Sequence, residues 1–245
     1  MVGSAGLGVL ALGDSITNGG GELQWGVALQ SWALWVARGL GLPFTGFAVD
    51  GARAADLVDE QIPAFERRSA VRGGRYELGC LYIGVNDVRA SDWDVDRFSV
   101  DFDRALRFLR ERCDRVLTAT APLDLGRPRA GSRVSQLNTA IEQVAAEQAA
   151  LVLDLRDFGG RNMVMTDHVH PTAFGQIAIA ERALDVLAAD GAQVRVRPST
   201  LIRYETTRWQ RLRGDWTYAY RAAKTTARAL AVVARLRLSR PRSPR

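Results

Sequence analysis

Residues 8–15 of the 245-residue chain read GVLALGDS, and this stretch decides the fold. Its apolar run, residues 8–12, has no polar interruption and ends at Gly13-Asp14, which is typical of a short strand buried on both faces. Such a strand belongs to a parallel sheet that helices cover on both sides. Ser15 therefore follows a buried strand directly, at the edge where these sheets carry their reactive groups.

Four more apolar runs alternate with stretches of helical period. The runs occupy residues 43–49, 77–83, 115–120 and 150–155, and the helical stretches occupy residues 25–40, 54–68, 95–112, 133–148 and 171–190. A helix follows each strand, so right-handed crossovers make the sheet mostly parallel. We expect an α/β fold in which the carboxyl ends of the strands share one edge.

A candidate nucleophile and base both follow predicted strands. A serine hydroxyl such as that of Ser15 needs a base within hydrogen-bond reach before it can attack an acyl carbon. The chain has only two histidines, His168 and His170, both in residues 167–171, DHVHP. Asp167 can accept from Nδ1 of His170 and leave Nε2 free to take the serine proton. The spacing therefore favours His170 over His168 as the base.

Candidate oxyanion donors follow two other strands. Gly51 comes just after the second apolar run, and Asn86 comes after the third in residues 84–87, GVND. Attack on an acyl carbon creates an oxyanion that needs preorganised N–H donors. We expect the backbone amides of Gly51 and Ser15 and the Asn86 side chain to be aimed at one point.

These four blocks resemble the SGNH hydrolases, also called GDSL esterases. The blocks are GDS at 13–15, Gly51, GVND at 84–87 and DHVH at 167–170, and the resemblance covers residues 7–190. It implies a three-layer α/β/α, flavodoxin-like fold with a five-stranded parallel sheet, no metal and no organic cofactor. In the family an asparagine often precedes the glycine of the second block, and residues 46–50, GFAVD, lack it.

The resemblance also implies a role for each residue of the site. Ser15 is the nucleophile, His170 the base and Asp167 its orienting partner. The Ser15 amide, Gly51 and Asn86 form the oxyanion hole.

Other interpretations of the same residues stay open. His168 is a second base, a substrate contact or an exposed loop residue. Asp167, His168 and His170 could hold a divalent metal, but no distant third ligand cluster accompanies them. Residues 19–21, GGG, lack the Gly-Lys-Ser/Thr ending of a phosphate loop, so we expect a flexible rim of the site. Residues 163–165, MVM, either line an acyl pocket or pack under the last helix.

Composition bounds the class of protein. Hydrophobic residues make up 47% of the chain, enough for a sizeable core. Cys80 and Cys113 lie in apolar stretches without Cys-x-x-Cys spacing, so we expect buried thiols. The first residues lack the basic region of a signal peptide, and no uncharged run reaches the roughly 18 residues of a membrane span. We therefore expect a cytoplasmic enzyme. Nothing in the sequence indicates an oligomeric state.

Charge divides the chain into a predicted hydrolase domain, residues 1–190, and an extension, residues 191–245. The extension carries thirteen arginines and Lys224 against two acidic residues, a net charge of +12, and because the chain totals +6 the domain sums to −6. Apolar residues recur at steps of three and four from Trp209 to Val233, and basic residues form a separate stripe, namely Arg221, Lys224, Arg228 and Arg235. We therefore expect residues 209–237 to form a basic amphipathic helix.

Three contacts of this helix stay open, namely the acidic domain, an anionic membrane surface and an acidic partner. No recognised motif supports nucleic-acid binding. Residues 239–245 are expected to be disordered.

Three functions fit these residues. The first is hydrolysis of a small acyl ester through an acyl-serine intermediate, as in an esterase or lipase. The second is acyl transfer, or deacetylation of a carbohydrate, by the same chemistry. The third is a catalytically weak binding module that acts through the basic extension, and the unbroken set of Ser15, Asp167 and His170 argues against it. The acyl chain and the alcohol of the substrate are not indicated.

Overall fold

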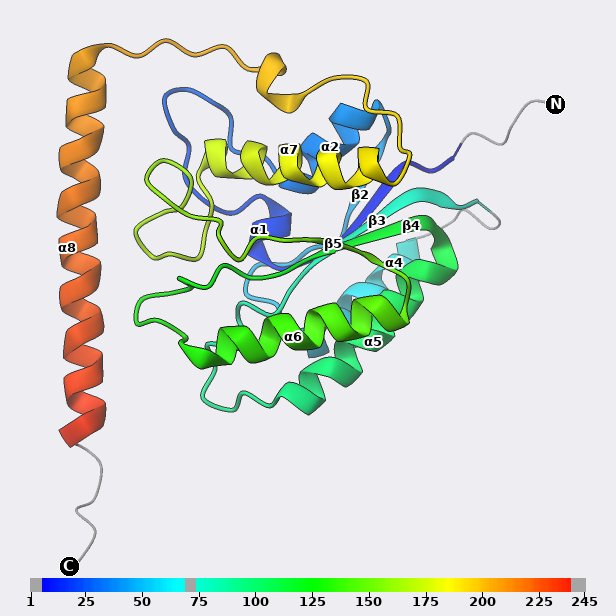
Figure 1. Cartoon of the computed structure of the whole chain (residues 1–245), viewed down its shortest axis with the longest axis horizontal. Helices are drawn as coiled ribbons and strands as arrows, with labels where there is room; N and C mark the ends of the chain where they lie inside the picture. Colours follow the sequence, from blue (N-terminus) through cyan, green and yellow to red (C-terminus); the bar gives the residue numbers. More distant parts are fainter. Residues whose placement is uncertain (1–5, 69–73, 239–245) are drawn as a thin grey trace, which may run out of the picture.

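The computed structural model describes residues 6–68 and 74–238, with side chains up to residue 231. Five strands form one parallel sheet in the order β2-β1-β3-β4-β5 (Figure 1). The strands are β1 Val9–Gly13, β2 Phe44–Gly46, β3 Tyr76–Tyr82, β4 Cys113–Ala119 and β5 Leu151–Leu153. This is the flavodoxin-like order, in which the chain reverses its direction of travel across the sheet between β1 and β3. The predicted α/β fold with five parallel strands is confirmed.

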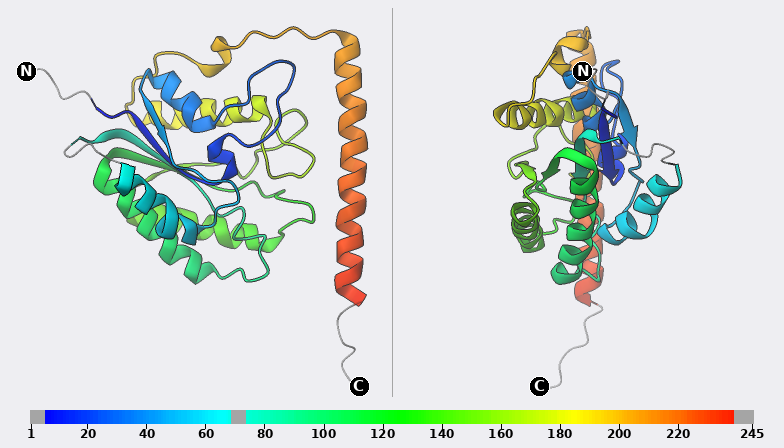
Figure 2. Two further views of the ribbon diagram at one scale, coloured as in Figure 1. Left: turned by 180° about the vertical axis from the view of Figure 1, so that it is seen from behind. Right: turned by 90° about the vertical axis from the view of Figure 1, so that its right-hand side faces the viewer.

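Helices cover both faces of the sheet and complete three layers (Figures 1 and 2). One layer consists of α2 Trp32–Leu40 and α7 Ala173–Ala189. The other consists of α3 Ala54–Asp56, the π-helical η1 Leu57–Gln61, α4 Ile62–Arg68, α5 Val95–Arg112 and α6 Ser132–Glu147. The short α1 Ser15–Asn18 lies at the carboxyl end of β1. All five residues of β1 are buried between the layers, as are the thiols of Cys80 and Cys113.

Two predicted strands are shorter than expected, and both lie at edges of the sheet. β2 and β5 each have three residues, whereas the apolar runs 43–49 and 150–155 are longer. Beyond β2 the chain still bonds to β1, because the Phe47 amide donates to the Ala11 carbonyl at 2.9 Å and the Val49 amide donates to the Gly13 carbonyl at 3.1 Å. These bonds carry residues 47–51 along β1 toward Ser15, although the expected asparagine is absent from them.

Two helices differ from their predictions, one in where it begins and the other in its type of helical turn. The helix expected from residue 25 begins at Trp32, where Ser31 caps it by accepting from the Ala33 amide at 3.1 Å. The preceding residues form a loop in which Trp25 and Gly26 both have positive φ. The helix expected over residues 54–68 contains the π-helical segment η1, a feature that often marks a functional position.

The chain continues beyond α7 along the body. The amides of Arg195 and Val196 donate to the Gly39 carbonyl at 2.8 and 3.1 Å, and the short 3-10 helix η2, Pro198–Leu201, follows. The helix α8, Arg208–Leu238, then stands beside the loop edge of the sheet (Figures 1 and 2). Residues 239–245, expected to be disordered, lie outside the described residues. No helix among residues 6–68 and 74–238 combines the length and apolar composition needed to span a bilayer.

Candidate active site

A tight turn between β1 and α1 presents Ser15. Gly13 has a φ of +146°, and a Cβ atom there would lie 2.4 Å from the Tyr82 carbonyl oxygen, so the turn requires glycine. Asp14 caps α1, because its Oδ1 accepts from the Ile16 amide at 2.9 Å. Ser15 is therefore held at the carboxyl end of β1, beside the point between β1 and β3 where parallel sheets of this order bind ligands.

The loop after β5 brings His170 and Asp167 to Ser15. Ser15 Oγ lies 2.9 Å from His170 Nε2, and His170 Nδ1 lies 2.7 Å from Asp167 Oδ2. The other carboxylate oxygen, Oδ1, accepts from the backbone amides of Val169 at 2.9 Å and His170 at 3.1 Å. In the neutral imidazole the nitrogen facing the carboxylate holds the proton, so Nε2 accepts from the serine hydroxyl. The structure thus joins the three predicted residues in one chain of hydrogen bonds.

The charges along this series of hydrogen bonds suit transfer of a proton from Ser15 to His170. Burial alone would raise the pKa of the Asp167 carboxyl, but hydrogen bonds from the His170 ring and from two backbone amides outweigh it, and the pKa is lowered. The hydrogen bond to Asp167 raises the pKa of His170 above its ordinary value, against the opposing effect of burial. An ionised carboxylate beside a more basic imidazole is the arrangement that a histidine base requires.

The predicted oxyanion donors lie on the loops after β2 and β3, and these loops are bonded to each other. Asn86 Nδ2 donates one hydrogen to the Ala52 carbonyl at 3.0 Å, which fixes the amide and leaves its second hydrogen available. Gly51 has a φ of +79°, a conformation that favours glycine. Among the groups of residues 6–68 and 74–238, none accepts a hydrogen bond from the amide of Gly51 or of Ser15.

Two buried glutamines, which the sequence did not single out, hold the backbone around Ser15. Gln61, from η1, accepts from the Gly13 amide at 3.0 Å and donates to the Gly13 carbonyl at 2.7 Å. Gln176, from α7, donates to the carbonyls of Ile16 at 2.9 Å and Gly20 at 3.1 Å. The only signal in the sequence was a glutamine on a helix face that is otherwise apolar. Through these hydrogen bonds both side chains hold in place the turn that carries Ser15.

The glycines at 19–21 allow two active-site segments to approach closely. The Gly20 amide donates to the Ser15 carbonyl at 2.6 Å. A Cβ atom on Gly21 would lie 2.0 Å from the carbonyl oxygen of Pro171, the residue after His170. The structure therefore gives these glycines a packing role between the Ser15 turn and the His170 loop, where a flexible rim was expected.

His168 points to partners of its own. Its Nε2 lies 3.0 Å from Arg127 Nη2, and its Nδ1 lies 3.0 Å from Asp124 Oδ2. The Gly126 amide also donates to the His168 carbonyl at 2.8 Å. Burial, followed by the charge of Arg127, lowers the pKa of His168. The half-buried ring thus ties the loop after β4 to the His170 loop. Within the described part of the chain, no three His, Cys, Asp or Glu side chains gather as a metal site.

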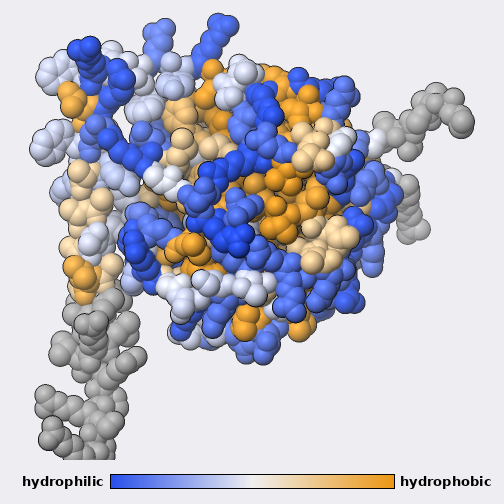
Figure 3. Space-filling model, viewed as in Figure 1, coloured by the Kyte–Doolittle hydropathy of each residue, from blue (hydrophilic) through white to orange (hydrophobic). Residues whose placement is uncertain are grey.

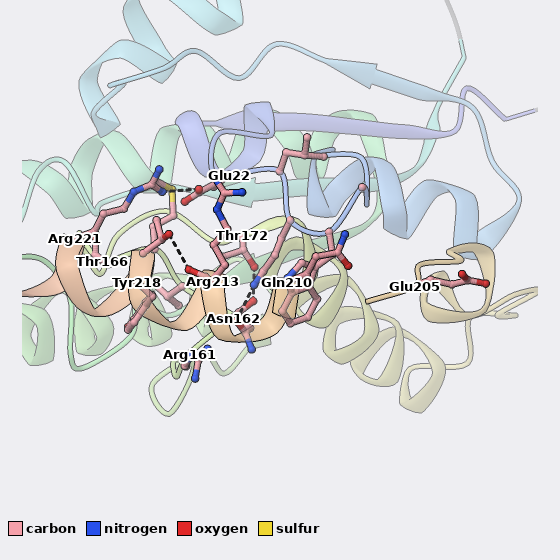
Figure 4. A pocket seen from close by; sticks show the side chains of 18 residues that line it. Glu22, Arg161, Asn162, Thr166, Thr172, Glu205, Gln210, Arg213, Tyr218 and Arg221 are labelled. Carbon is pink, nitrogen blue, oxygen red and sulfur yellow. Dashed lines mark hydrogen bonds and ion pairs between the residues drawn. The ribbon is translucent and has the colours of Figure 1, made fainter. Parts of the chain in front are cut away.

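A cleft of about 620 Å³ lies between the body and α8 (Figure 4). Its body wall consists of residues 22–26, 161–162, 164–166 and Thr172, which is two residues from His170. Its other wall includes Gln210, Arg213 and Tyr218 of α8. Of the three apolar residues 163–165, Met163 packs against the core and Met165 lines the cleft. Val164 does both, because it is a buried core residue that also lines the cleft.

A flavodoxin-like sheet with a serine, a histidine and an aspartate bonded in series at its switch point defines a hydrolase-type α/β protein. The model of the GDSL-like lipase/acylhydrolase family matches residues 11–178, so the chain belongs to that family of hydrolases. A comparison with curated proteins returned no match.

Solved structures share the fold. Axe2, an acetylxylan esterase from Geobacillus stearothermophilus, is 20% identical, with a TM-score of 0.55 over 73% of this chain and 93% of that chain. A member of the lipolytic protein G-D-S-L family from Veillonella parvula is 22% identical, with a TM-score of 0.58 over 74% and 97%. LAE5, an alpha/beta hydrolase from the metagenome of Lake Arreo, is 17% identical, with a TM-score of 0.56 over 74% and 94%. At these identities the likeness concerns the fold.

Proposed function

We propose that the protein is a serine esterase that cleaves carboxylic esters through an acyl-serine intermediate. The hydrogen bond of 2.9 Å between Ser15 Oγ and His170 Nε2 carries the proposal, because it joins a nucleophile to a base that Asp167 orients. Membership of a lipase/acylhydrolase family supports the same reaction class.

In the first half of the reaction, His170 Nε2 takes the proton of Ser15 as Oγ attacks the ester carbonyl carbon. The tetrahedral oxyanion accepts hydrogen bonds from the amides of Ser15 and Gly51 and from the Asn86 side chain. Collapse breaks the carbon–oxygen bond to the alcohol, and the imidazolium returns its proton to the departing alkoxide. Asp167 stays ionised throughout and stabilises the imidazolium.

In the second half, water replaces the alcohol. His170 takes a proton from water, the hydroxide attacks the acyl carbon, and the acid leaves as Ser15 Oγ recovers its proton. If a sugar or another alcohol takes the place of water, the same steps give acyl transfer.

The second candidate is deacetylation of a carbohydrate, and the polar lining of the cleft favours it. Gln24 Nε2 donates to Asn162 Oδ1 at 2.7 Å, and Arg213 and Tyr218 face the same space from α8 (Figure 4). Side-chain amides, a guanidinium and a phenol suit hydroxyl groups. Axe2, which shares the fold, is named an acetylxylan esterase.

A graded panel of esters tests both candidates. Wild type and Ser15→Ala are compared on p-nitrophenyl esters of increasing acyl length and on acetylated xylo-oligosaccharides, with competing alcohols to detect acyl transfer. We expect turnover that Ser15→Ala lacks. Asn162→Ala should raise KM for the sugar ester and leave p-nitrophenyl acetate unchanged if the cleft holds the alcohol. Absence of turnover on every ester would favour the binding-module alternative.

A further inference from the structure

The helix α8 presents an uninterrupted apolar stripe to solvent. The stripe consists of Trp209, Leu212, Trp216, Ala219, Tyr220, Ala223, Ala227 and Leu230, which at 3.6 residues per turn fall within an arc of about 100°. Trp209 is 81% exposed, Trp216 77% and Tyr220 68%. No charged residue falls inside the arc. A contiguous exposed apolar stripe with three aromatic side chains is typical of an interaction site.

The opposite face of α8 is the one that meets the body. Arg221 Nη1 lies 2.6 Å from Glu22 Oε1, and Asp215 forms an ion pair with Arg161. Residues at steps of three and four on this side, such as Tyr218, Ala222 and Thr225, are partly buried. The helix therefore contacts the body, but not through the apolar stripe, because the side that carries Asp215 and Arg221 makes that contact.

Basic residues flank the stripe. Arg213 and Lys224 lie within about 40° of one border of the arc, and Arg228 lies about 80° from that border. Arg208 lies about 20° from the other border, near the start of the helix. Among the described residues, none of these four side chains forms an ion pair with the body. Figure 3 shows apolar residues along α8 between hydrophilic neighbours. Val233 and Arg235, the last members of the two predicted stripes, lie beyond the described side chains.

We propose that α8 binds an anionic lipid surface, with the stripe in the interfacial region and the flanking cations on the headgroups. Tryptophan and tyrosine favour the boundary between headgroups and acyl chains, and arginine and lysine add attraction to anionic lipid. The helix lies on the membrane and does not cross it, in keeping with its composition.

The composition favours lipid over the two other occupants. A second copy would bring two helices of like charge together, and the stripe has alanine where a helix pair usually packs leucine or isoleucine. An acidic protein would pair with the cations but has no need of three exposed aromatic rings in a row. Only a surface that is apolar beneath an anionic layer uses both features.

The orientation has a consequence for the site. α8 contacts Glu22 and Arg161, and the segments of these residues flank Pro171 next to His170. Binding through the stripe would turn this edge of the sheet toward the membrane. The proposal does not depend on the esterase reaction and is tested without it.

Sedimentation of the full-length protein with vesicles tests the proposal. Vesicles of phosphatidylcholine alone are compared with vesicles that also contain phosphatidylglycerol. We expect binding only to the anionic vesicles, with partitioning weakened more than about tenfold in Trp209→Ala/Trp216→Ala/Tyr220→Ala. In Arg208→Gln/Lys224→Gln/Arg228→Gln partitioning should weaken about 100-fold, and salt should weaken it in wild type.

The matched control is Val100→Ala/Leu123→Ala/Leu201→Ala, which removes exposed apolar side chains outside α8 and should bind like wild type. Circular dichroism checks that each variant keeps its helix content. Wild type that stays in solution with anionic vesicles overturns the proposal. A dimer in lipid-free sedimentation that the aromatic variant loses would assign the stripe to a second copy. Equal binding to soluble polyglutamate, unaffected by the aromatic substitutions, would assign the helix to an acidic partner.

Discussion

The Gln61 side chain forms hydrogen bonds with both the amide and the carbonyl of Gly13, two residues before Ser15. Its Oε1 accepts from the Gly13 amide at 3.0 Å and its Nε2 donates to the Gly13 carbonyl at 2.7 Å, across 48 positions of sequence. Gln61 is 1% exposed and lies in the π-helical turn η1. The turn that presents Ser15 is therefore held in place by a side chain from the helical layer that contains η1.

Gln61→Met keeps the length of this side chain and removes both hydrogen bonds. We expect a loss of about 2–3 kcal/mol in the free energy of unfolding, because buried backbone groups lose their partners. The kcat on a short ester should fall while KM changes little, since the nucleophile is displaced and the substrate surface is kept. Urea unfolding and steady-state kinetics measure the two effects. Gln143→Met, on the exposed side of α6, is the control. Equal stability and turnover in both variants would show that Gln61 does not hold the Ser15 turn in place.

The pH dependence of activity should follow His170. The base acts only when neutral, and the hydrogen bond to Asp167 raises its pKa, so the acid limb of kcat/KM lies at higher pH than an ordinary histidine would give. Asp167→Asn removes the negative charge. The limb should then move to lower pH while the plateau falls by about 10⁴. His168→Gln is the control, because that ring bonds to Asp124 and Arg127 instead. A limb that stays in place in Asp167→Asn, or moves in His168→Gln, contradicts the assignment.

Gly21 should tolerate no side chain. Its φ of +143° disfavours other residues, and a Cβ atom would lie 2.0 Å from the Pro171 carbonyl oxygen. Gly21→Ala must therefore move the His170 loop, and we expect both a lower Tm and a loss of most turnover. Gly26→Ala provides the comparison, since Gly26 has a φ of +78° and no atom within 4 Å of the added carbon. It should cost about 1 kcal/mol of backbone strain and little activity. Similar turnover in the two variants would exclude the close-packing role.

Asp14 should make the protein less stable as pH rises through the weakly acidic range. Burial raises the pKa of its carboxyl to about 7, and its Oδ2 has no partner within the described residues. An unfolded aspartate releases its proton near pH 3.9, so between about pH 4 and pH 7 the native state binds more protons than the unfolded state. Asp14→Asn does not titrate. Its free energy of unfolding relative to wild type should therefore rise across this window. Parallel pH curves for the two proteins, measured by urea unfolding, would mean that Asp14 is ionised in the native state.

Local patterns predicted the sheet and much of the site. The run at residues 8–12 is buried on both faces, so its composition alone indicates a central strand. Asp167 and His170 share one loop, so their spacing could indicate a hydrogen bond. The parallel sheet then brings that loop to Ser15, because the carboxyl ends of all strands meet at one edge.

The hydrogen bonds that single buried side chains make to distant backbone groups could not be predicted. Gln176 bonds to carbonyls 160 and 156 positions away, and no local pattern announces such a bond. The sequence pattern predicts a start for α2 seven residues before Trp32, because apolar side chains in the preceding loop continue the helical period. The stripe on α8 was visible in the sequence, but the side that meets the body depends on ion pairs with Glu22 and Arg161.

The most direct test of the central claim is covalent labelling of Ser15. A fluorophosphonate reacts with an activated serine, so intact mass and peptide mapping report which residue is modified. We expect one adduct on Ser15 in wild type and in Ser132→Ala, where an exposed serine is removed. Ser15→Ala should carry none, and His170→Ala should react at least about 10³-fold more slowly. Equal labelling of wild type and Ser15→Ala, or an adduct on another residue, would contradict the account.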